Sequence, residues 1–232
     1  MISVGVEWVN NFSAPCVNDD LVNRAECAEG FLDAMTARGF TSMFDWGDGN
    51  AWETDFRSND NGGDALDWSD AVNFCYFADH GVNGGPGGQM DIGFTSQHEY
   101  CTGWSDSWRL GISLLRWFVL DTCDLVLDTD TATVSNWFGP MQGVHLLFGF
   151  VGEAYDDGGR GASFGSDAAN GAVLSSAWLS DASSWWEGET AIAIAAGTTQ
   201  DDATNRRDNE TINWVYEDLP AETSWLAWKW YE

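Results

Sequence analysis

Two side chains in the sequence are of the types that nucleophilic catalysis uses, and each follows an apolar run of strand length. His80 lies in the segment FCYFADHG and Cys123 in the segment WFVLDTCD. Histidine exchanges a proton near neutral pH, and a cysteine thiolate is a strong nucleophile. Gly81 directly follows the histidine, and a glycine lets the backbone approach a substrate closely. The pattern predicts covalent catalysis in which Cys123 attacks a carbonyl carbon and His80 handles the proton.

The elements that must position these two residues can be predicted from the apolar pattern. Nearly continuous apolar runs at 71–79 and 114–121 are typical of parallel strands covered on both faces. We expect further strands at 2–9, 40–45, 145–151 and 191–196, and helices at 19–38 (capped by Asn18 and stopped by Gly39), 106–115 and 167–179. This alternation predicts an α/β fold, a three-layer sandwich with a mainly parallel central sheet.

In such a sheet, ligands bind beyond the carboxyl ends of the strands. If the strands at 71–79 and 114–121 are parallel neighbours, His80 and Cys123 leave the sheet side by side at one edge. The amide of Gly81 would then join that of Cys123 in stabilising an oxyanion.

The two motifs resemble those of a known superfamily. YFADHG is similar to YFTDHG of legumains and LLSHG of caspases, and WFVLDTCD is similar to the strand that delivers their catalytic cysteine. The chain therefore resembles the caspase, legumain and gingipain (clan CD) cysteine peptidases, and the resemblance implies one caspase-haemoglobinase-like domain over residues 1–232. It implies that Cys123 attacks the substrate, that Gly81 and Cys123 amides hold the oxyanion, and that His80 protonates the departing amine. The implied substrate is a peptide or protein.

The residues around Cys123 differ from the family pattern. Caspases have Ala-Cys-Arg-Gly and legumains Ala-Cys-Glu-Ser-Gly, whereas this chain has the run TCDL. The resemblance also implies that the expected strand at 145–150 and the loop after it build the pocket for the residue before the scissile bond. The candidates in that pocket are Phe150, Glu153, Asp156 and Arg160.

Three further residues are secondary candidates. Asp79 either steadies the histidine or its turn, or is a capping or solvated carboxylate. We expect His98 and His145 to be structural, and His145 is the rival base if His80 lies too far from Cys123.

The charge balance is the strongest compositional signal. There are 37 acidic residues against 9 basic ones, Lys229 is the only lysine, and the net charge is −28. This excludes a general phosphate-binding surface, so we expect no nucleic-acid partner. At about 1 M salt the screening length falls to about 3 Å and like charges cease to repel. The composition therefore indicates a protein of a high-salt cell, cytoplasmic, or secreted if a leader was trimmed; an ordinary acidic surface does not explain the missing lysines.

Other sequence features argue against a membrane, a metal and a cofactor. No apolar run reaches the length of about 18 residues that a bilayer-spanning helix needs. The five cysteines contain no CxxC pair, so we expect no metal site, and nothing indicates a cofactor. Cys16 and Cys27 could pair in an exported protein, whereas a reducing cytosol would keep them as thiols.

The aromatic content supports a second hypothesis, a non-catalytic relative of such peptidases that binds a peptide or glycan. The chain has 15 tryptophans, far above ordinary usage, and exposed rings stack on flat ligand faces. Buried packing explains most of them. The pairs at 185–186 and at Trp228 and Trp230 are the ones whose exposure would favour binding.

Overall fold

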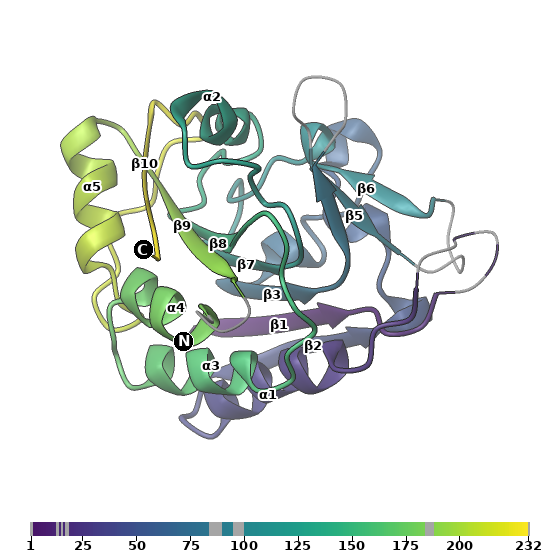
Figure 1. Ribbon diagram of the computed structural model, residues 1–232. Helices are drawn as coiled ribbons and strands as arrows, with labels where there is room; N and C mark the ends of the chain where they lie inside the picture. The colour runs from purple at the N-terminus through teal and green to yellow at the C-terminus, as the bar shows by residue number, and fades with distance from the viewer. Residues whose placement is uncertain are drawn as a thin grey trace.

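A computed structural model describes residues 2–12, 14, 16, 19–83, 90–94, 100–183 and 188–231. Its centre is a seven-stranded sheet (Figure 1). From one edge to the other, the strands are β10 (Trp225–Trp230), β9 (Thr190–Gly197), β8 (Leu146–Val151), β7 (Trp117–Asp121), β3 (Phe74–Ala78), β1 (Ser3–Trp8) and β2 (Thr41–Gly47). Neighbours from β8 to β2 run parallel, whereas β9 is antiparallel to both β8 and β10. The prediction of an α/β fold with a mostly parallel central sheet is confirmed.

Burial explains why the two central strands have continuous apolar sequences. Every residue of β3 and β7 is buried, because both faces of the sheet are covered. The register pairs Ala78 with Asp121, so the two strands end at the same level.

Helices cover one face of the sheet. They are α1 (Arg24–Thr36), α3 (Arg160–Ala169) and α4 (Leu174–Ala182); α5 (Gln200–Asn209) packs against β9 and β10, and the short α2 (Thr131–Val134) lies near the top of Figure 1. Helices α1 and α3 approach closely, because a side chain at Gly161 would overlap the carbonyl of Cys27. Aromatic rings of α1, β3 and α3, among them Phe31, Phe74 and Phe164, fill the space beneath them.

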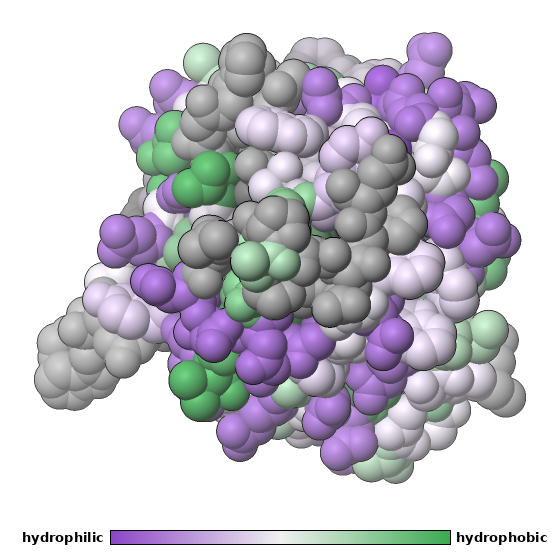
Figure 2. Space-filling view, turned by 90° about the vertical axis from the view of Figure 1, so that its right-hand side faces the viewer, coloured by the Kyte–Doolittle hydropathy of each residue, from purple (hydrophilic) through white to green (hydrophobic). Residues whose placement is uncertain are grey.

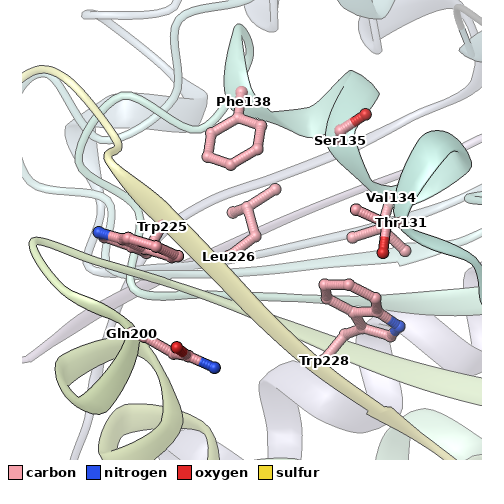
Figure 3. Close-up of a pocket in the computed structure, with 8 residues that line it drawn as sticks. All are labelled: Thr131, Val134, Ser135, Phe138, Gln200, Trp225, Leu226 and Trp228. Atoms are coloured by element: carbon pink, nitrogen blue, oxygen red, sulfur yellow. The ribbon is translucent and has the colours of Figure 1, made fainter.

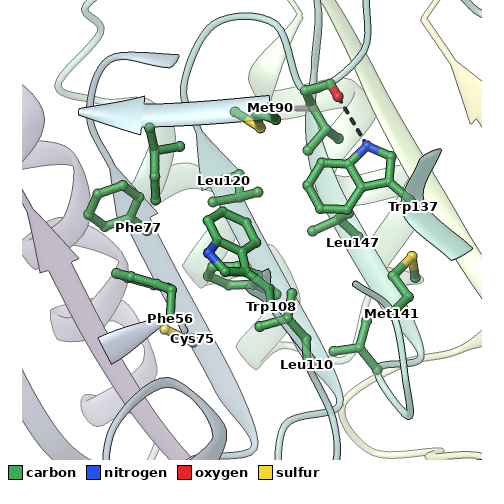
Figure 4. Close-up of a cluster of buried hydrophobic side chains, with 14 of the residues drawn as sticks. Phe56, Cys75, Phe77, Met90, Trp108, Leu110, Leu120, Trp137, Met141 and Leu147 are labelled. Carbon is green, nitrogen blue, oxygen red and sulfur yellow. Dashed lines mark hydrogen bonds between the residues drawn. The ribbon is translucent and has the colours of Figure 1, made fainter. Parts of the chain in front are cut away.

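Short elements cover the other face. They include a small antiparallel sheet of β4 (Gly81–Asn83), β5 (Met90–Gly93) and β6 (Thr102–Trp104), and the 3-10 helices η1 (Asp48–Asn50), η2 (Glu53–Asp55), η3 (Asn59–Asn61), η4 (Ser69–Ala71), η5 (Ser105–Ser107) and η6 (Ser135–Phe138). Figure 4 shows the cluster of buried side chains under them, with Trp108 and Trp137 among the strand residues. The indole nitrogen of Trp137 donates to the Leu125 carbonyl at 3.0 Å, so this polar group is satisfied inside the core.

Three expectations about helices require correction. The helix expected at 106–115 is wrong: η5 ends at Ser107, and Gly111 has a φ of +87°, a left-handed conformation that ends helical structure. The helix expected at 167–179 is two helices, α3 and α4, separated by Gly171 with a φ of +85°. The first helix begins at Arg24 instead of residue 19, and its predicted cap, Asn18, lies outside the described residues.

Figure 2 shows the right-hand side of Figure 1, which is the side toward which the β1 arrow points. Hydrophilic residues cover much of the part that is coloured, and hydrophobic residues form only small patches between them. Of the 13 tryptophans among the described residues, only four are buried, namely Trp108, Trp117, Trp137 and Trp178. Four more are half-buried and pack against the core, and five are exposed, among them Trp214 at 73%, so burial explains fewer tryptophans than expected. Of the pairs singled out from the sequence, 185–186 lies outside the described residues, Trp228 is half-buried, and Trp230 is exposed.

Candidate active site

His80 and Cys123 stand at equivalent positions beyond two neighbouring parallel strands. Ala78 and Asp121 are paired at the ends of β3 and β7, and each candidate lies two residues further on. The amide of Asp79 donates to the Asp121 carbonyl at 3.2 Å, which extends the pairing past the last strand residue. The two residues thus leave the carboxyl edge side by side, where open α/β sheets bind ligands.

Gly81 fits against the backbone of Cys123. A side chain at position 81 would overlap the Cys123 carbonyl oxygen and crowd the hydroxyl of Thr122. Glycine therefore allows the two strand ends to meet, a close approach that a Cβ would prevent. The amide of Cys123 donates to no acceptor among the described residues, so it is available to a ligand.

The ring of His80 is held from the segment that follows β1. Its Nε2 lies 2.8 Å from the carbonyl oxygen of Asp19, and its ring packs against Phe12 at a centroid distance of 5.2 Å. A carbonyl oxygen only accepts, so Nε2 carries the hydrogen and Nδ1 is the nitrogen that can take up a proton. An orienting group behind the base is a recurring feature of sites with a nucleophile and a base.

Asp79 fixes the turn that carries the histidine. Its Oδ1 accepts from the amide of His80 at 2.5 Å, and only 3% of the residue is exposed. Asp79 therefore contacts the backbone of the turn at His80, as in the first of the two roles considered for it from the sequence.

The thiol of Cys123 is half-buried and held by the loop after β8. Its Sγ accepts from the amide of Ala154 at 3.3 Å and lies 3.5 Å from the carbonyl of the same residue. Burial raises the pKa of Cys123 above its usual value, and the smaller opposing effect of the Ala154 amide does not offset it. The sulfur and the His80 ring have these separate partners and do not hydrogen bond to each other. The resting group is a neutral thiol.

A buried ionic network adjoins the strand end that carries Cys123. Asp121, two residues before it, is fully buried between two arginines: its Oδ1 lies 3.1 Å from Arg24 and 2.5 Å from Arg160. Its other oxygen accepts from the hydroxyl of Tyr76 at 2.8 Å. Burial raises the pKa of Asp121, but the two guanidinium groups outweigh it and hold that pKa below its usual value.

The four residues expected to line a substrate pocket differ in their exposure to solvent. Phe150 and Arg160 are buried, with the guanidinium 4.6 Å from the ring centroid, and Arg160 also pairs with Glu189 at 2.5 Å. Asp156 is half-buried and binds Arg24 at 2.7 Å. Glu153 is exposed. The loop reaches Cys123 through Ala154, and of the three charged candidates Glu153 is the one without a described ion-pair partner.

Comparison with known proteins identifies a family. The model of a domain of unknown function (DUF6345) matches residues 6–231. The chain belongs to this family. No curated protein matches it. Within the described ranges, the DUF6345 chain has no helix long and apolar enough to cross a membrane. The same part of the chain brings together no three His, Cys, Asp or Glu side chains that could hold a metal ion.

His145 of this DUF6345 domain cannot be the rival base, because it lies at the amino ends of the parallel strands, whereas Cys123 lies beyond their carboxyl ends. It precedes β8, which runs parallel to β7, whereas Cys123 follows β7. The imidazole is fully buried, and its Nδ1 is 2.6 Å from Glu210. His98 lies outside the described residues.

Neither of the two alternatives considered for Cys16, a bond to Cys27 or a free thiol, is the one that the structure has. Cys16 forms a disulfide with Cys101, just before β6. Cys27 is instead a buried thiol on the inner side of α1, where its sulfur lies 3.1 Å from Asp121. Burial raises its pKa well above the ordinary value, so it is not the reactive cysteine.

Three contacts of the site have no signal in the sequence. The carbonyl of Asp19 and the backbone of Ala154 act through groups that every residue carries. Arg24 reaches Asp121 from a helix far away in the sequence, and nothing in the sequence pairs these two residues.

Proposed function

We propose that the chain is a cysteine peptidase, or a related amide-bond hydrolase, that uses His80 and Cys123, as its resemblance to the caspase and legumain superfamily implies. One observation carries the proposal. The two residues occupy equivalent positions beyond β3 and β7, and the Asp19 carbonyl fixes the histidine tautomer that leaves Nδ1 as a proton acceptor. A nucleophile, a base and a group that orients the base are thus assembled at a ligand-binding edge.

The proposed reaction has two stages. His80 Nδ1 takes the proton of the Cys123 thiol, the sulfur attacks the carbonyl carbon, and the carbonyl electron pair moves onto oxygen. The amides of Gly81 and Cys123 stabilise this oxyanion. When it collapses, the C–N bond breaks, the amine leaves with the proton from His80, and a thioester remains. Water then attacks the thioester, His80 takes its proton, and the acid and the free thiol are released.

The resting contacts define what substrate binding must change. The Cys123 sulfur has to leave the carbonyl of Ala154, because a thiol that donates there directs its hydrogen away from His80. A substrate strand that displaces the loop contact would free the sulfur. The buried Asp121 is neutralised by Arg24 and Arg160, so it is not available to a basic substrate side chain.

The test is digestion of a complex peptide library by the full chain in molar KCl, with new termini identified by mass spectrometry. Wild type is expected to cleave, and both Cys123→Ala and His80→Ala are expected to lose the cleavage. The matched control is Cys75→Ala, because Cys75 is a buried thiol within β3 that does not lie at the edge. Cleavage that survives Cys123→Ala, or a wild type that leaves every peptide intact, would overturn the proposal.

A second candidate function is binding without catalysis. Its support is a cavity of about 260 Å³ between β10 and the segment from α2 to η6, lined by the rings of Phe138, Trp225 and Trp228 (Figure 3). Gln200, Thr131 and Ser135 add polar groups, a combination that suits a flat ligand face. A peptide or glycan array read with the Cys123→Ala variant separates the two functions, because binding there needs no thiol.

A further inference from the structure

A second cavity has tryptophan walls and lies at the ends of β1 and β2. It has a volume of about 130 Å³ and is lined by Trp46, Trp52, Trp68, Asn50 and Asp55. Trp46 and Trp68 are nearly perpendicular, at 81° with centroids 5.6 Å apart, so the two rings form a corner. This space suits a small headgroup, since drug-sized ligands occupy about 300 to 1,000 Å³.

The carboxyl group in this cavity pairs with no lysine or arginine of the part of the chain that the structure describes. Asp55 is 2% exposed, and its Oδ1 accepts no hydrogen bond from a donor of the described residues. Its Oδ2 accepts from the amide of Trp52 at 3.0 Å. Behind it lies Glu7 of β1, which is fully buried and whose two oxygens likewise lack a donor.

The cation nearest in sequence is engaged elsewhere. Arg57 lies 3.8 Å from Glu53 and over the ring of Tyr100, at 4.9 Å from its centroid. No lysine or arginine is among the described residues that line the cavity. Once ionised, Asp55 therefore places a single negative charge beside an aromatic wall, which is the electrostatic complement of a cation that is itself partly apolar.

From this arrangement we infer that the tryptophan cavity binds a methylated ammonium group, with the indole faces of Trp46, Trp52 and Trp68 around its methyls and Asp55 as its counter-ion. A bare metal ion is a poorer occupant, because it needs several oxygen ligands and the walls are carbon. A sugar ring is also poorer, because it stacks on a flat platform and the perpendicular rings make a corner. The inference does not depend on the proposed peptidase activity.

The experiment uses the full chain at pH 8 in about 1 M KCl, where the screening length is about 3 Å and the overall charge no longer gathers cations. Choline is the probe, and 3,3-dimethylbutan-1-ol is its neutral isostere. Binding is followed by the indole N–H cross-peaks in NMR, in which Trp52 is identified by its loss in a variant. We expect saturable shifts with choline and none with the alcohol.

Variants locate the binding. Trp52→Leu and Asp55→Asn are expected to weaken it by about tenfold or more, and Trp52→Phe is expected to retain most of it, because the aromatic face is kept. Trp52 is 36% exposed, so changing it spares the core, whereas Asp55 is 2% exposed and Asp55→Asn is a buried, isosteric change. Trp214→Leu, at an exposed site that does not line this cavity, is the matched control and should leave the affinity unchanged.

Three outcomes would overturn the inference: equal binding of the neutral alcohol, saturation of the same cross-peaks by glucose instead of choline, or choline binding that Trp52→Leu and Asp55→Asn do not alter. Circular dichroism shows whether each variant is folded. If Trp52→Leu is not folded, the choline affinity of Trp52→Phe is measured in its place.

Discussion

Asp121 Oδ1 lies 2.5 Å from Nη1 of Arg160, in the interior of the protein and two residues before Cys123. Both side chains are fully buried, and Arg160 also binds Glu189. The attraction between two buried charges offsets their loss of hydration, and removing one of them leaves the other buried without a counter-ion. The strand end that carries Cys123 is therefore fixed by ionic contacts from α1 and α3.

Asp121→Asn should consequently destabilise the fold far more than loss of a surface ion pair. Removing this carboxylate leaves Arg24 and Arg160 buried without their shared counter-ion, which costs about 3–5 kcal/mol. The control is Asp218→Asn: Asp218 pairs with Arg116 at 2.7 Å but its side chain is 70% exposed, so the loss is about 0–1 kcal/mol. Denaturant unfolding measures both, and equal losses would contradict the assigned role of Asp121.

Gly81→Ala should disturb the candidate site directly. The new Cβ would overlap the Cys123 carbonyl, a backbone atom that cannot rotate away, and we expect a loss of about 1–3 kcal/mol together with an altered alkylation rate of Cys123. Gly139→Ala is the control, because a Cβ there has no neighbour within 4 Å. Thermal unfolding and iodoacetamide kinetics give the two readouts. A Gly81→Ala protein indistinguishable from wild type would mean that the strand ends do not meet as described.

Local pattern predicted the strands well, because the buried runs at β3, β7, β8 and β9 are apolar except at their ends, where β7 finishes in Asp121 and β9 begins with Thr190. It failed at 106–115, where Trp108 and Leu115 are seven residues apart, a helical spacing, but are core residues of an irregular segment that bends at Gly111. It also missed β10, whose sequence WLAWKW places large rings on both faces, with Trp225 and Trp230 exposed, and so lacks the usual alternation.

The sequence could predict only those parts of the site that act through particular side chains, not the contacts made by backbone groups. The placement of His80 and Cys123 at two strand ends follows from the sequence, and the condition for bringing them to the same end of the sheet, parallel pairing of β3 with β7, is met in the structure. The tryptophan cavity was not foreseen, because Trp46 and Trp68 come together through the irregular segment between β2 and β3.

The stability of the fold should fall as the pH rises from about 4 to about 7. Burial, with a further contribution from Asp64 and Glu53, raises the pKa of Asp55 to about 7, and burial with Asp55 raises that of Glu7. An unfolded carboxyl group titrates near pH 4, so across this window the folded protein binds more protons, and its free energy of unfolding declines with pH.

Asp55→Asn should remove part of that decline, by the order of a few kcal/mol across the window. Asp70, whose pKa burial raises to about 6, contributes a slope of the same sign that remains in the variant. Asp60→Asn, an exposed position in η3, should leave the slope unchanged. Urea unfolding from pH 4 to pH 8 provides the measurement, and a slope that Asp55→Asn does not reduce would contradict the assignment.

Reduction of the Cys16–Cys101 disulfide should lower stability substantially. The bridge closes a loop with a sequence separation of 85, for which chain entropy predicts about 4–5 kcal/mol. The double variant Cys16→Ser/Cys101→Ser should match the reduced wild type and should not respond to reductant. If reductant shifts the unfolding of the double variant as well, another disulfide is responsible.

The alkylation rate of Cys123 should keep rising at pH values where an ordinary thiol, with a pKa of about 8.5, is already ionised. Burial raises the pKa of Cys123, and since only the thiolate reacts, its labelling by iodoacetamide should be slow at pH 7 and should still rise above pH 9. Cys27 and Cys75 are buried more deeply, so mass spectrometry should place the first adduct on Cys123. In His80→Ala the rate at neutral pH should fall further, because the proton acceptor is lost. Equal labelling of the three thiols, or a rate that His80→Ala leaves unchanged, would show that the two residues do not act together.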